Sequence, residues 1–228
     1  MNKVSIITPC FNAAEYLNTT YQALSAQTYT NWEWVVVDDC STDNSVQILE
    51  ELQKSDARVI IIQNKQNSGA AITRNNSLNC ATGEYLAFLD ADDLWMTNKL
   101  QEQVAFIEAH NHNFVYHNYW TVDAKGQKIK EQICPPTVTA KSLLKFNPFA
   151  TSSVMIKRDI IEKNNIRFKE HLRRRQDYLF WYDAITVAKE AQGMGSFLSH
   201  YRIFGSDSLS ANKKKMAIIQ WKLYREEF

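Results

Sequence analysis

The sequence of 228 residues lacks the features that are typical of membrane-spanning and secreted proteins. No apolar run approaches the length of about 18 residues that a membrane-spanning helix requires. The first ten residues, MNKVSIITPC, enter a strand-like run directly and have no long apolar core of the kind found in signal peptides. These absences predict a cytoplasmic location.

The spacing of the cysteines, the distribution of the glycines and the net charge exclude further classes of protein. The four cysteines are widely spaced and form no C-x-x-C pair, which argues against a disulfide framework or a zinc site. The six glycines are scattered, so neither the G-x-G-x-x-G of dinucleotide oxidoreductases nor a P-loop is present. The net charge of +1 creates no global field for a nucleic acid, and we expect no such partner.

The first half of the chain alternates apolar runs with helical patterns. The expected strands are 3–9, 32–39, 58–64 and 84–90, and the expected helices are 10–28, 41–54, 68–83 and one through Leu100, Val104 and Ile107. Asn12 followed by Glu15 predicts how the first helix starts, and Gly83 predicts where the third ends. Because the strands are apolar on both faces, they predict an α/β fold with a mostly parallel sheet flanked by helices.

Residues from about 110 onward are less regular. The expected strands there are 113–122, 151–157 and 196–204, and the expected helices are 140–146, one opening at Asp159, 176–190 and 213–228. No internal repeat, low-complexity tract or linker divides the chain. We therefore expect a single domain over residues 1–228.

Two of the expected strands end in aspartates, in VVVDDCSTDNS (35–45) and YLAFLDADDLW (85–95). In a doubly wound sheet, ligands bind at the carboxyl ends of the strands. Asp90 and Asp92 can face the same pocket because side chains alternate along a strand. Clustered carboxylates repel one another unless something compensates them, and their oxygens suit Mg²⁺ or Mn²⁺. An acidic turn that caps the following helix is the alternative.

The Asp38–Asp39 cluster has the same two interpretations. Ser41, Thr42 or Asp43 is expected to cap the second helix, which leaves Asp39 available for a ligand.

These stretches together resemble the family 2 glycosyltransferases, an inverting family of the GT-A fold that uses nucleotide-sugar donors. The matching stretches occur in the family's order: VSIITPCFN, WEWVVVDDCSTDNS, NSGAAITRNNSLNCATGEYLAFLDADDLW and RRRQDYLFW. Through RQDYLFW and YRIFGSDSLSANKKK the chain is similar to bacterial teichuronic-acid, capsule and O-antigen-type transferases. The resemblance implies a Rossmann-like nucleotide-sugar-binding half at about 1–110 and an acceptor-binding half, with a terminal helix, at about 111–228.

The resemblance also implies roles for single residues. Asp177 takes the position of the catalytic base. Asp92 and Asp90 are the expected ligands of a divalent cation, Mn²⁺ or Mg²⁺, with Asp93 and His200 as second choices. The residues expected to bind the nucleotide-sugar are Pro9, Phe11, Asn12, Asp39, Arg74, Asp90, Ala91, Asp92 and Arg202.

The chemistry of an inverting transfer fits this assignment. One base takes the proton of the acceptor hydroxyl, and a cation offsets the charge on the departing diphosphate. No second carboxylate is needed, in contrast to glycoside hydrolases. The family's usual Glu-Asp pair is Gln176-Asp177 here, which leaves the base intact but puts the acceptor-orienting role of the glutamate in doubt. Taken alone, Asp177 is better interpreted as a helix cap, and the order of the motifs is what favours the base.

The resemblance thus implies transfer from a nucleotide-sugar, with UDP favoured, to a saccharide or lipid-linked saccharide in bacterial cell-surface polysaccharide synthesis. A metal-dependent nucleotidyltransferase is an alternative, but the first loop, TPCFNAAEY, lacks the glycines and lysines that hold a triphosphate. A non-catalytic nucleotide-sugar-binding module is the other alternative. The intact D-x-D and Asp177 argue against it.

The last residues, MAIIQWKLYREEF, mix aromatic side chains with lysines. Such a helix can pack on the domain, pair with a second subunit, or rest on an anionic membrane face. Packing on the domain is favoured. Oligomerisation and peripheral contact with the inner face of the cytoplasmic membrane stay open.

Overall fold

The structure, a computed structural model, describes residues 1–204, 219–221, 223–225 and 227. Its strands are β1 (Val4–Cys10), β2 (Trp32–Asp38), β3 (Val59–Gln63), β4 (Tyr85–Phe88), β5 (Leu94–Trp95), β6 (Phe114–Val122), β7 (Lys128–Gln132), β8 (Thr137–Val138), β9 (Met155–Lys157) and β10 (Ala191–Arg202). Its helices are α1 (Ala14–Ser25), α2 (Ser45–Ser55), α3 (Ala70–Cys80), α4 (Lys99–His110), α5 (Ala140–Leu143), α6 (Arg158–Lys163) and α7 (Gln176–Ala188), with a 3₁₀ turn, η1 (Thr151–Ser153).

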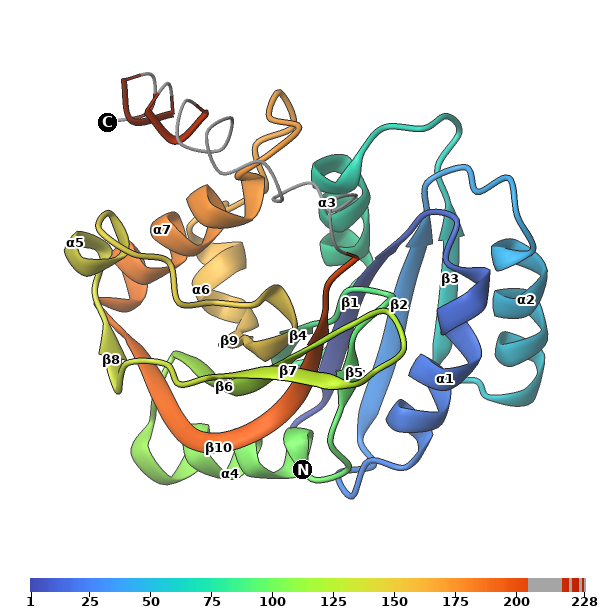
Figure 1. The fold of residues 1–228 in the computed structure, drawn as a ribbon, viewed down its shortest axis with the longest axis horizontal. Coiled ribbons are helices and arrows are strands. Elements are labelled where there is room, and N and C mark those ends of the chain that lie inside the picture. Colours follow the sequence, from blue (N-terminus) through green and yellow to red (C-terminus); the bar gives the residue numbers. More distant parts are fainter. Residues whose placement is uncertain (205–218, 222, 226, 228) are drawn as a thin grey trace.

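Within the described residues the strands form one 10-stranded sheet with helices on both faces (Figure 1). Its main order is β3-β2-β1-β4-β9-β6-β10-β5, with β7 beside β6 and β8 beside β10. Strands β3, β2, β1 and β4 are parallel, whereas β9 is antiparallel to both β4 and β6. The predicted α/β fold with a mostly parallel sheet is therefore confirmed for the first half, and the second half is mixed.

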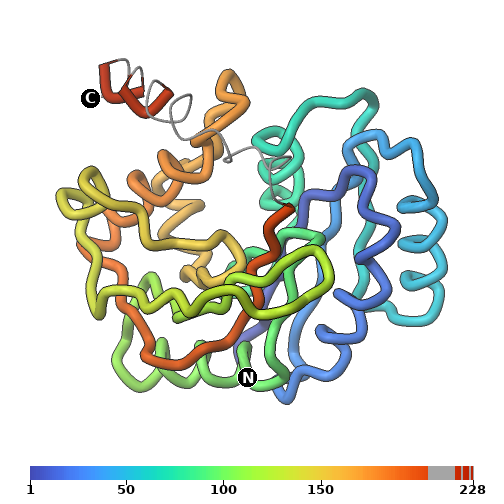
Figure 2. Tube along the Cα trace, in the orientation of Figure 1, coloured from blue at the N-terminus to red at the C-terminus, as the bar shows by residue number. Residues whose placement is uncertain are grey.

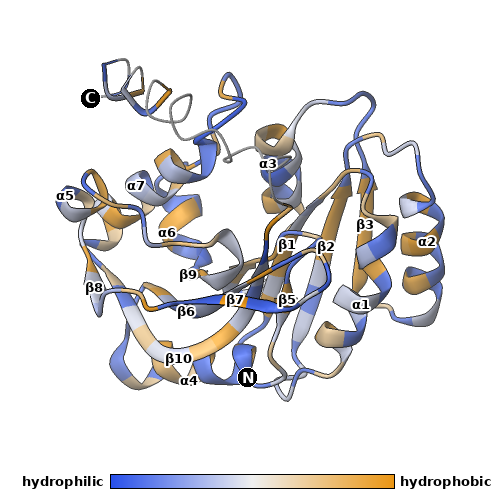
Figure 3. Ribbon diagram, in the orientation of Figure 1, coloured by the Kyte–Doolittle hydropathy of each residue, from blue (hydrophilic) through white to orange (hydrophobic). Residues whose placement is uncertain are grey.

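The two faces of the sheet carry separate hydrophobic clusters because neighbouring strand residues point in opposite directions. Ile7 belongs to the cluster under α3, α6 and α7, and Ile6 to the cluster under α1, α2 and α4. Figure 3 shows apolar residues toward the carboxyl ends of β2 and β3, beside helices α1 and α2 in which hydrophilic and hydrophobic residues alternate. This double burial explains the unbroken apolar run Trp34–Val37.

Two predicted helix ends are wrong. The first helix begins at Ala14 with Ala13 as its N-cap, and Asn12 has a left-handed backbone and accepts a hydrogen bond from Thr42 N at 2.8 Å instead. The third helix ends at Cys80 rather than at Gly83. Glycine is required at position 83 by a close approach to β1: a Cβ there would lie 2.6 Å from the carbonyl oxygen of Lys3.

The second half differs more from expectation. The expected strand 151–157 is a 3₁₀ turn followed by the short β9, and the short strands β5 and β8 carry no sequence signal. In Figure 2 the chain up to about residue 90 lies largely on the right and residues 114–204 largely on the left. Of the expected helix 213–228, residues 219–221, 223–225 and 227 are helical, and the others lie outside the described residues. None of the described helices has the length and apolarity to cross a membrane.

Candidate active site

A cavity of about 530 Å³ lies at the carboxyl ends of β1, β2 and β4. Seven of the nine predicted nucleotide-sugar residues line it: Pro9, Phe11, Asn12, Asp39, Asp90, Ala91 and Asp92. They come from three strand ends that the parallel register brings to one edge of the sheet. Arg74 and Arg202 are not among the lining residues. Arg74 pairs with Asp90, and Arg202 contacts the backbone of Asp92 and the side chain of Asp93.

The side chain of Asp39 organises one wall of this cavity. Its carboxylate accepts hydrogen bonds from the backbone N–H groups of Ser68 and Gly69, at 2.7 and 2.8 Å, and from Nδ2 of Asn64 at 2.7 Å. Gly69 precedes α3 with φ of +84°, a left-handed conformation that favours glycine. Asp39 therefore holds the loop between β3 and α3 in place. Its predicted bond to a nucleobase stays a prediction.

The two carboxylates of the D-x-D have different environments. Asp90 is paired with Arg74, whose buried guanidinium lies 2.6 Å from Asp90 Oδ1. Within the described residues Asp92 has no partner at ion-pair distance. Burial, followed by the negative charge of Asp90, raises the pKa of Asp92 to about 6. Asp92 is thus the carboxylate that a cation in the cavity would stabilise most.

Asp93, a second-choice metal ligand, is turned into the protein. Its side chain is 1% exposed and accepts hydrogen bonds from the hydroxyl of Ser152, at 2.5 Å, and from the backbone N–H of Arg202, at 2.8 Å. The same Ser152 hydroxyl accepts the backbone N–H of Asp90 at 3.1 Å. Asp93 and Ser152 therefore fix the shape of the D-x-D turn.

The side chain of Arg202 also holds the D-x-D turn in place. Its Nε donates to the carbonyl oxygen of Asp92 at 2.9 Å, and its Nη1 donates to that of Ala124 at 2.7 Å. Its guanidinium carbon lies 5.2 Å from the ring centre of Tyr16, a residue of the cavity wall. Arg202 ties the D-x-D turn to the β6–β7 connection. Direct contact of Arg202 with a nucleotide-sugar stays a prediction.

His200 lies apart from the cavity lining. Its ring meets Trp120 edge-on, with 5.3 Å between ring centres. Burial lowers the pKa of His200, and the charges of Lys128 and Arg202 act in the same direction. The structure does not bring His200 into the cavity with Asp90 and Asp92, so its role as a metal ligand stays a prediction.

Asp177 occupies the first turn of α7 and is half-buried. It follows Arg175, which has a left-handed backbone with φ of +64°, so the chain turns sharply into the helix. Asp177 does not line the 530 Å³ cavity. The neighbouring Gln176 is 8% exposed, and its Oε1 has no hydrogen-bond partner among the described residues. The predicted role of Asp177 as the base stays a prediction.

Comparison with known proteins decides the family. The model described as "Glycosyl transferase family 2" matches residues 5–183, which include β1, the D-x-D and Asp177. The chain belongs to glycosyl transferase family 2. It is accordingly an enzyme, a glycosyltransferase, and the family predicted from the sequence is confirmed.

Two curated relatives of this family 2 glycosyltransferase cover most of its length. TuaG of Bacillus subtilis, named for teichuronic acid biosynthesis, is 36% identical over 98% of this chain and 87% of its own. WfgD of Escherichia coli is 33% identical over 96% of this chain and 83% of its own. WfgD is named a UDP-Glc:alpha-D-GlcNAc-diphosphoundecaprenol beta-1,3-glucosyltransferase.

Solved structures show the same fold. The crystal structure of S. aureus TarS 1-349 in complex with UDP-GlcNAc superposes with a TM-score of 0.79 at 26% identity. That match covers 92% of this chain and 61% of the TarS fragment, so the present chain spans less than two thirds of its length. PcManGT of Pyrobaculum calidifontis, at 18% identity and a TM-score of 0.73, shares the fold. The fold is therefore the predicted GT-A fold.

The cavity of the family 2 enzyme also contains residues that sequence reasoning missed. Tyr16 of α1 and Phe204, which follows β10, both line it, with 5.8 Å between their ring centres. Asn67 and Thr73 line it from the loop before α3 and from α3 itself. Tyr16 and Thr73 look like ordinary helix residues in the sequence. Phe204 reaches the cavity only because β10 returns to the D-x-D turn.

Proposed function

We propose that the enzyme transfers a sugar, with inversion, from a UDP-sugar to a hydroxyl of a saccharide or lipid-linked saccharide acceptor. The observation that carries this proposal is the convergence of Asp39, Asp90 and Asp92 on one cavity. The names of the relatives support the substrates, since TarS binds UDP-GlcNAc and WfgD uses UDP-Glc with a lipid-linked acceptor. By the same analogy, the product belongs to a bacterial cell-surface polysaccharide.

Asp92 and Asp90 fit a divalent cation, Mn²⁺ or Mg²⁺. Both are oxygen donors on one cavity wall, and Asp92 has no ion-pair partner among the described residues. No cluster of three or more His, Cys, Asp or Glu side chains suited to a metal occurs in the described part of the chain. Two carboxylates plus substrate phosphates and water are the coordination that Mg²⁺ usually has. When bound, the cation supplies positive charge that stabilises the leaving diphosphate.

Asp177 acts as the base in this proposal. Its carboxylate takes the proton of the acceptor hydroxyl while the hydroxyl oxygen attacks the anomeric carbon. The new glycosidic bond forms on one face of the sugar as the bond to the diphosphate breaks on the other, which inverts the configuration. Asp177 stands in the first turn of α7, and the first turn of a helix is a favourable place for the negative charge of a carboxylate.

A lipid-linked acceptor would bring the enzyme to the inner face of the cytoplasmic membrane. The terminal helical residues supply the contact in this proposal, since Trp221 is 59% exposed and lies against Arg225. Flotation with anionic vesicles tests this contact. Trp221→Ala is expected to weaken the association, and equal flotation of the variant and the native protein would refute it.

The stereochemistry of the product tests the reaction. The enzyme, Mn²⁺ and a soluble analogue of GlcNAc-diphospholipid are incubated with UDP-glucose or UDP-GlcNAc, and the product is examined by proton NMR. Because these donors are α-linked, the proposal predicts a β-linked product. An α-linked product would refute inversion, and release of free UDP without any saccharide product would refute transfer.

A further inference from the structure

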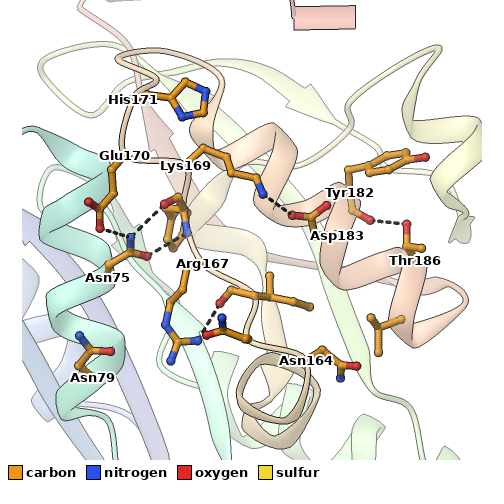
Figure 4. Close-up of a pocket in the computed structure, with 14 residues that line it drawn as sticks. Asn75, Asn79, Asn164, Arg167, Lys169, Glu170, His171, Tyr182, Asp183 and Thr186 are labelled. Atoms are coloured by element: carbon orange, nitrogen blue, oxygen red, sulfur yellow. Dashed lines mark hydrogen bonds and ion pairs between the residues drawn. The ribbon is translucent and has the colours of Figure 1, made fainter. Parts of the chain in front are cut away.

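A second cavity, of about 740 Å³, lies between α3, α7 and the segment 164–171 (Figure 4). Asn75 and Asn79 line it from α3, and Tyr182, Asp183 and Thr186 line it from α7. It shares no lining residue with the cavity of the candidate active site. Its volume lies within the range of about 300–1,000 Å³ that is common for small-molecule sites.

The segment 164–171, which forms the wall between α3 and α7, is held in place by hydrogen bonds to Asn75 and by ring stacking of Phe168. The side-chain amide of Asn75 pairs with the backbone of Phe168 in both directions, donating to its carbonyl and accepting its N–H, each at 2.9 Å. The same amide donates to Glu170 at 3.1 Å. The ring of Phe168 is buried and stacks on Phe180, with 4.0 Å between ring centres. The cavity is therefore preformed.

The charges around the cavity disfavour an anionic ligand. The arginine and the lysine that line it each have a carboxylate partner, Arg167 with Glu162 at 3.1 Å and Lys169 with Asp183 at 3.5 Å, and the ring of His171 contacts Glu227 at 3.3 Å. Sites for phosphate or carboxylate normally present an arginine or lysine with free donors. A phosphate here would meet an arginine and a lysine whose charges are already offset by carboxylates, whereas an uncharged ligand does not depend on a free cation.

The remaining polar groups suit a ligand rich in hydroxyls. Asn79 and Asn165 present exposed side-chain amides, which both donate and accept hydrogen bonds. The hydroxyl of Thr186 donates to the carbonyl oxygen of Tyr182, at 2.8 Å, and keeps its own lone pairs for a ligand. Tyr182 adds an aromatic side chain to the lining of the cavity (Figure 4).

The cavity shares α3 with the candidate active site, and its other helix, α7, carries the proposed base Asp177. On α3, Arg74 pairs with Asp90 while the adjacent Asn75 builds the wall of the second cavity. On α7, Tyr182 lies five residues after Asp177, about 7.5 Å along the helix axis. We propose that this cavity is a second saccharide-binding site, which holds an uncharged stretch of the acceptor chain away from the reacting hydroxyl. This inference rests on the proposed function, since it assumes a saccharide acceptor.

NMR titration of the ¹⁵N-labelled protein, saturated with UDP and Mg²⁺, tests the inference. The probes are maltotriose and chitotriose as neutral trimers, with trigalacturonate and inorganic phosphate as anionic comparators. At least one neutral trimer is expected to shift the amide signals of 164–171 and 182–187, with a Kd in the millimolar range. No shift from either neutral trimer at about 20 mM, or shifts there from the anions alone, would overturn the inference.

The same samples separate this inference from the proposed function. UDP is expected to shift the signals of 67–69 and 90–92 whether or not a trimer is present. If UDP shifts them and the trimers shift nothing, only the second site is refuted. If a trimer binds at 164–171 and UDP does not bind at all, the proposed donor is refuted and the saccharide site stands.

Variants locate the binding. Tyr182→Ala and Asn79→Ala are each expected to weaken trimer binding by about three- to tenfold, as the loss of one good contact does. Asn18→Ala is the matched control, an exposed asparagine on α1, which covers the opposite face of the sheet. Unchanged affinity in both test variants, or an equal loss in the control, would contradict the assignment. UDP-induced shifts that match those of the native protein show that each variant is folded.

Discussion

The two halves of this enzyme are built differently. In the first half β1, β2, β3 and β4 are parallel and in register without a shift. The strands β1, β2 and β3 each lead through a loop into a helix, and β4 leads through the D-x-D turn into the short β5. In the second half β6 pairs antiparallel with β7 and β9 and parallel with β10, with register irregularities along β10 and at the start of β7.

This difference has a consequence for the active site. The aspartates of the first half reach the cavity from the turns that directly follow β2 and β4. The second half acts through long-range contacts: Ser152 reaches Asp93 across 59 residues of sequence, and Arg202 reaches it across 109. We infer that the first half binds the donor, and that the second half supplies the base and fixes the D-x-D turn.

The largest effect is expected from Asp177→Asn, which affects only the second half. Removal of a general base should lower kcat by about 10²–10⁴-fold. The Kd of UDP should not change, because Asp177 does not line the donor cavity. Transfer rates and UDP titrations on the same preparation check this. Near-native turnover, or loss of UDP binding along with turnover, would break the division between the halves.

Asp92→Ala should raise the Kd of UDP, which Asp177→Asn is expected to leave unchanged. It removes the carboxylate that is best placed for a cation, so UDP should bind at least about tenfold more weakly in the presence of Mn²⁺. In EDTA the variant and the native enzyme should bind UDP equally. Glu50→Ala, at an exposed position on α2, controls for the loss of one negative charge. Native Mn²⁺-dependence in Asp92→Ala would place the cation elsewhere.

Ser152→Ala tests whether the second half fixes the D-x-D turn of the first half. Ser152 belongs to the second half, and its hydroxyl contacts Asp93 and Asp90. The variant leaves the buried Asp93 carboxylate and the N–H of Asp90 without their shared hydroxyl. Loss of such a supporting contact should raise the Mn²⁺ concentration needed for half-maximal activity by about tenfold.

Ser153→Ala is the matched control for this effect. Its hydroxyl is equally buried and donates to the carbonyl oxygen of Ala150, away from the aspartates. The account predicts native Mn²⁺-dependence in this control. Equal effects in the two variants would mean that Ser152 acts only on stability.

The smallest effect concerns pH. Because burial and Asp90 raise the pKa of Asp92 to about 6, a proton competes with the cation at that carboxylate below this pH. The apparent affinity for Mn²⁺ should therefore be flat above pH 6 and fall by up to about tenfold per unit below it. Titrations of Mn²⁺ in the presence of UDP across this range check the prediction. A constant affinity down to pH 5 would contradict it.

The sequence predicted what short-range patterns control. The expected strand ends at residues 9, 39 and 90 lie within two residues of the observed ends at Cys10, Asp38 and Phe88, and the parallel sheet brings the aspartates that follow β2 and β4 together. Ser152 and Phe204 could not be predicted in this way. They contact the site through long-range pairings of β9 and β10, which depend on packing across the whole sheet rather than on any local pattern.

The same limit explains the errors at the helix ends. Asn12 has the residue type of a helix cap, but its side chain bonds to the neighbouring loop at Thr42. Gly83 resembles a helix stop, yet the glycine is needed because the backbone of β1 passes too close for a side chain. In both cases a tertiary contact replaced the local role.

The most direct test of the account is calorimetric titration of UDP into the enzyme, first with Mn²⁺ and then with EDTA. The account predicts saturable binding with Mn²⁺ that is lost or strongly weakened in EDTA, and weaker binding of GDP and dTDP under the same conditions. Equal binding of UDP in Mn²⁺ and in EDTA would contradict a cation at Asp90 and Asp92. No binding of UDP in either condition would contradict the donor site itself.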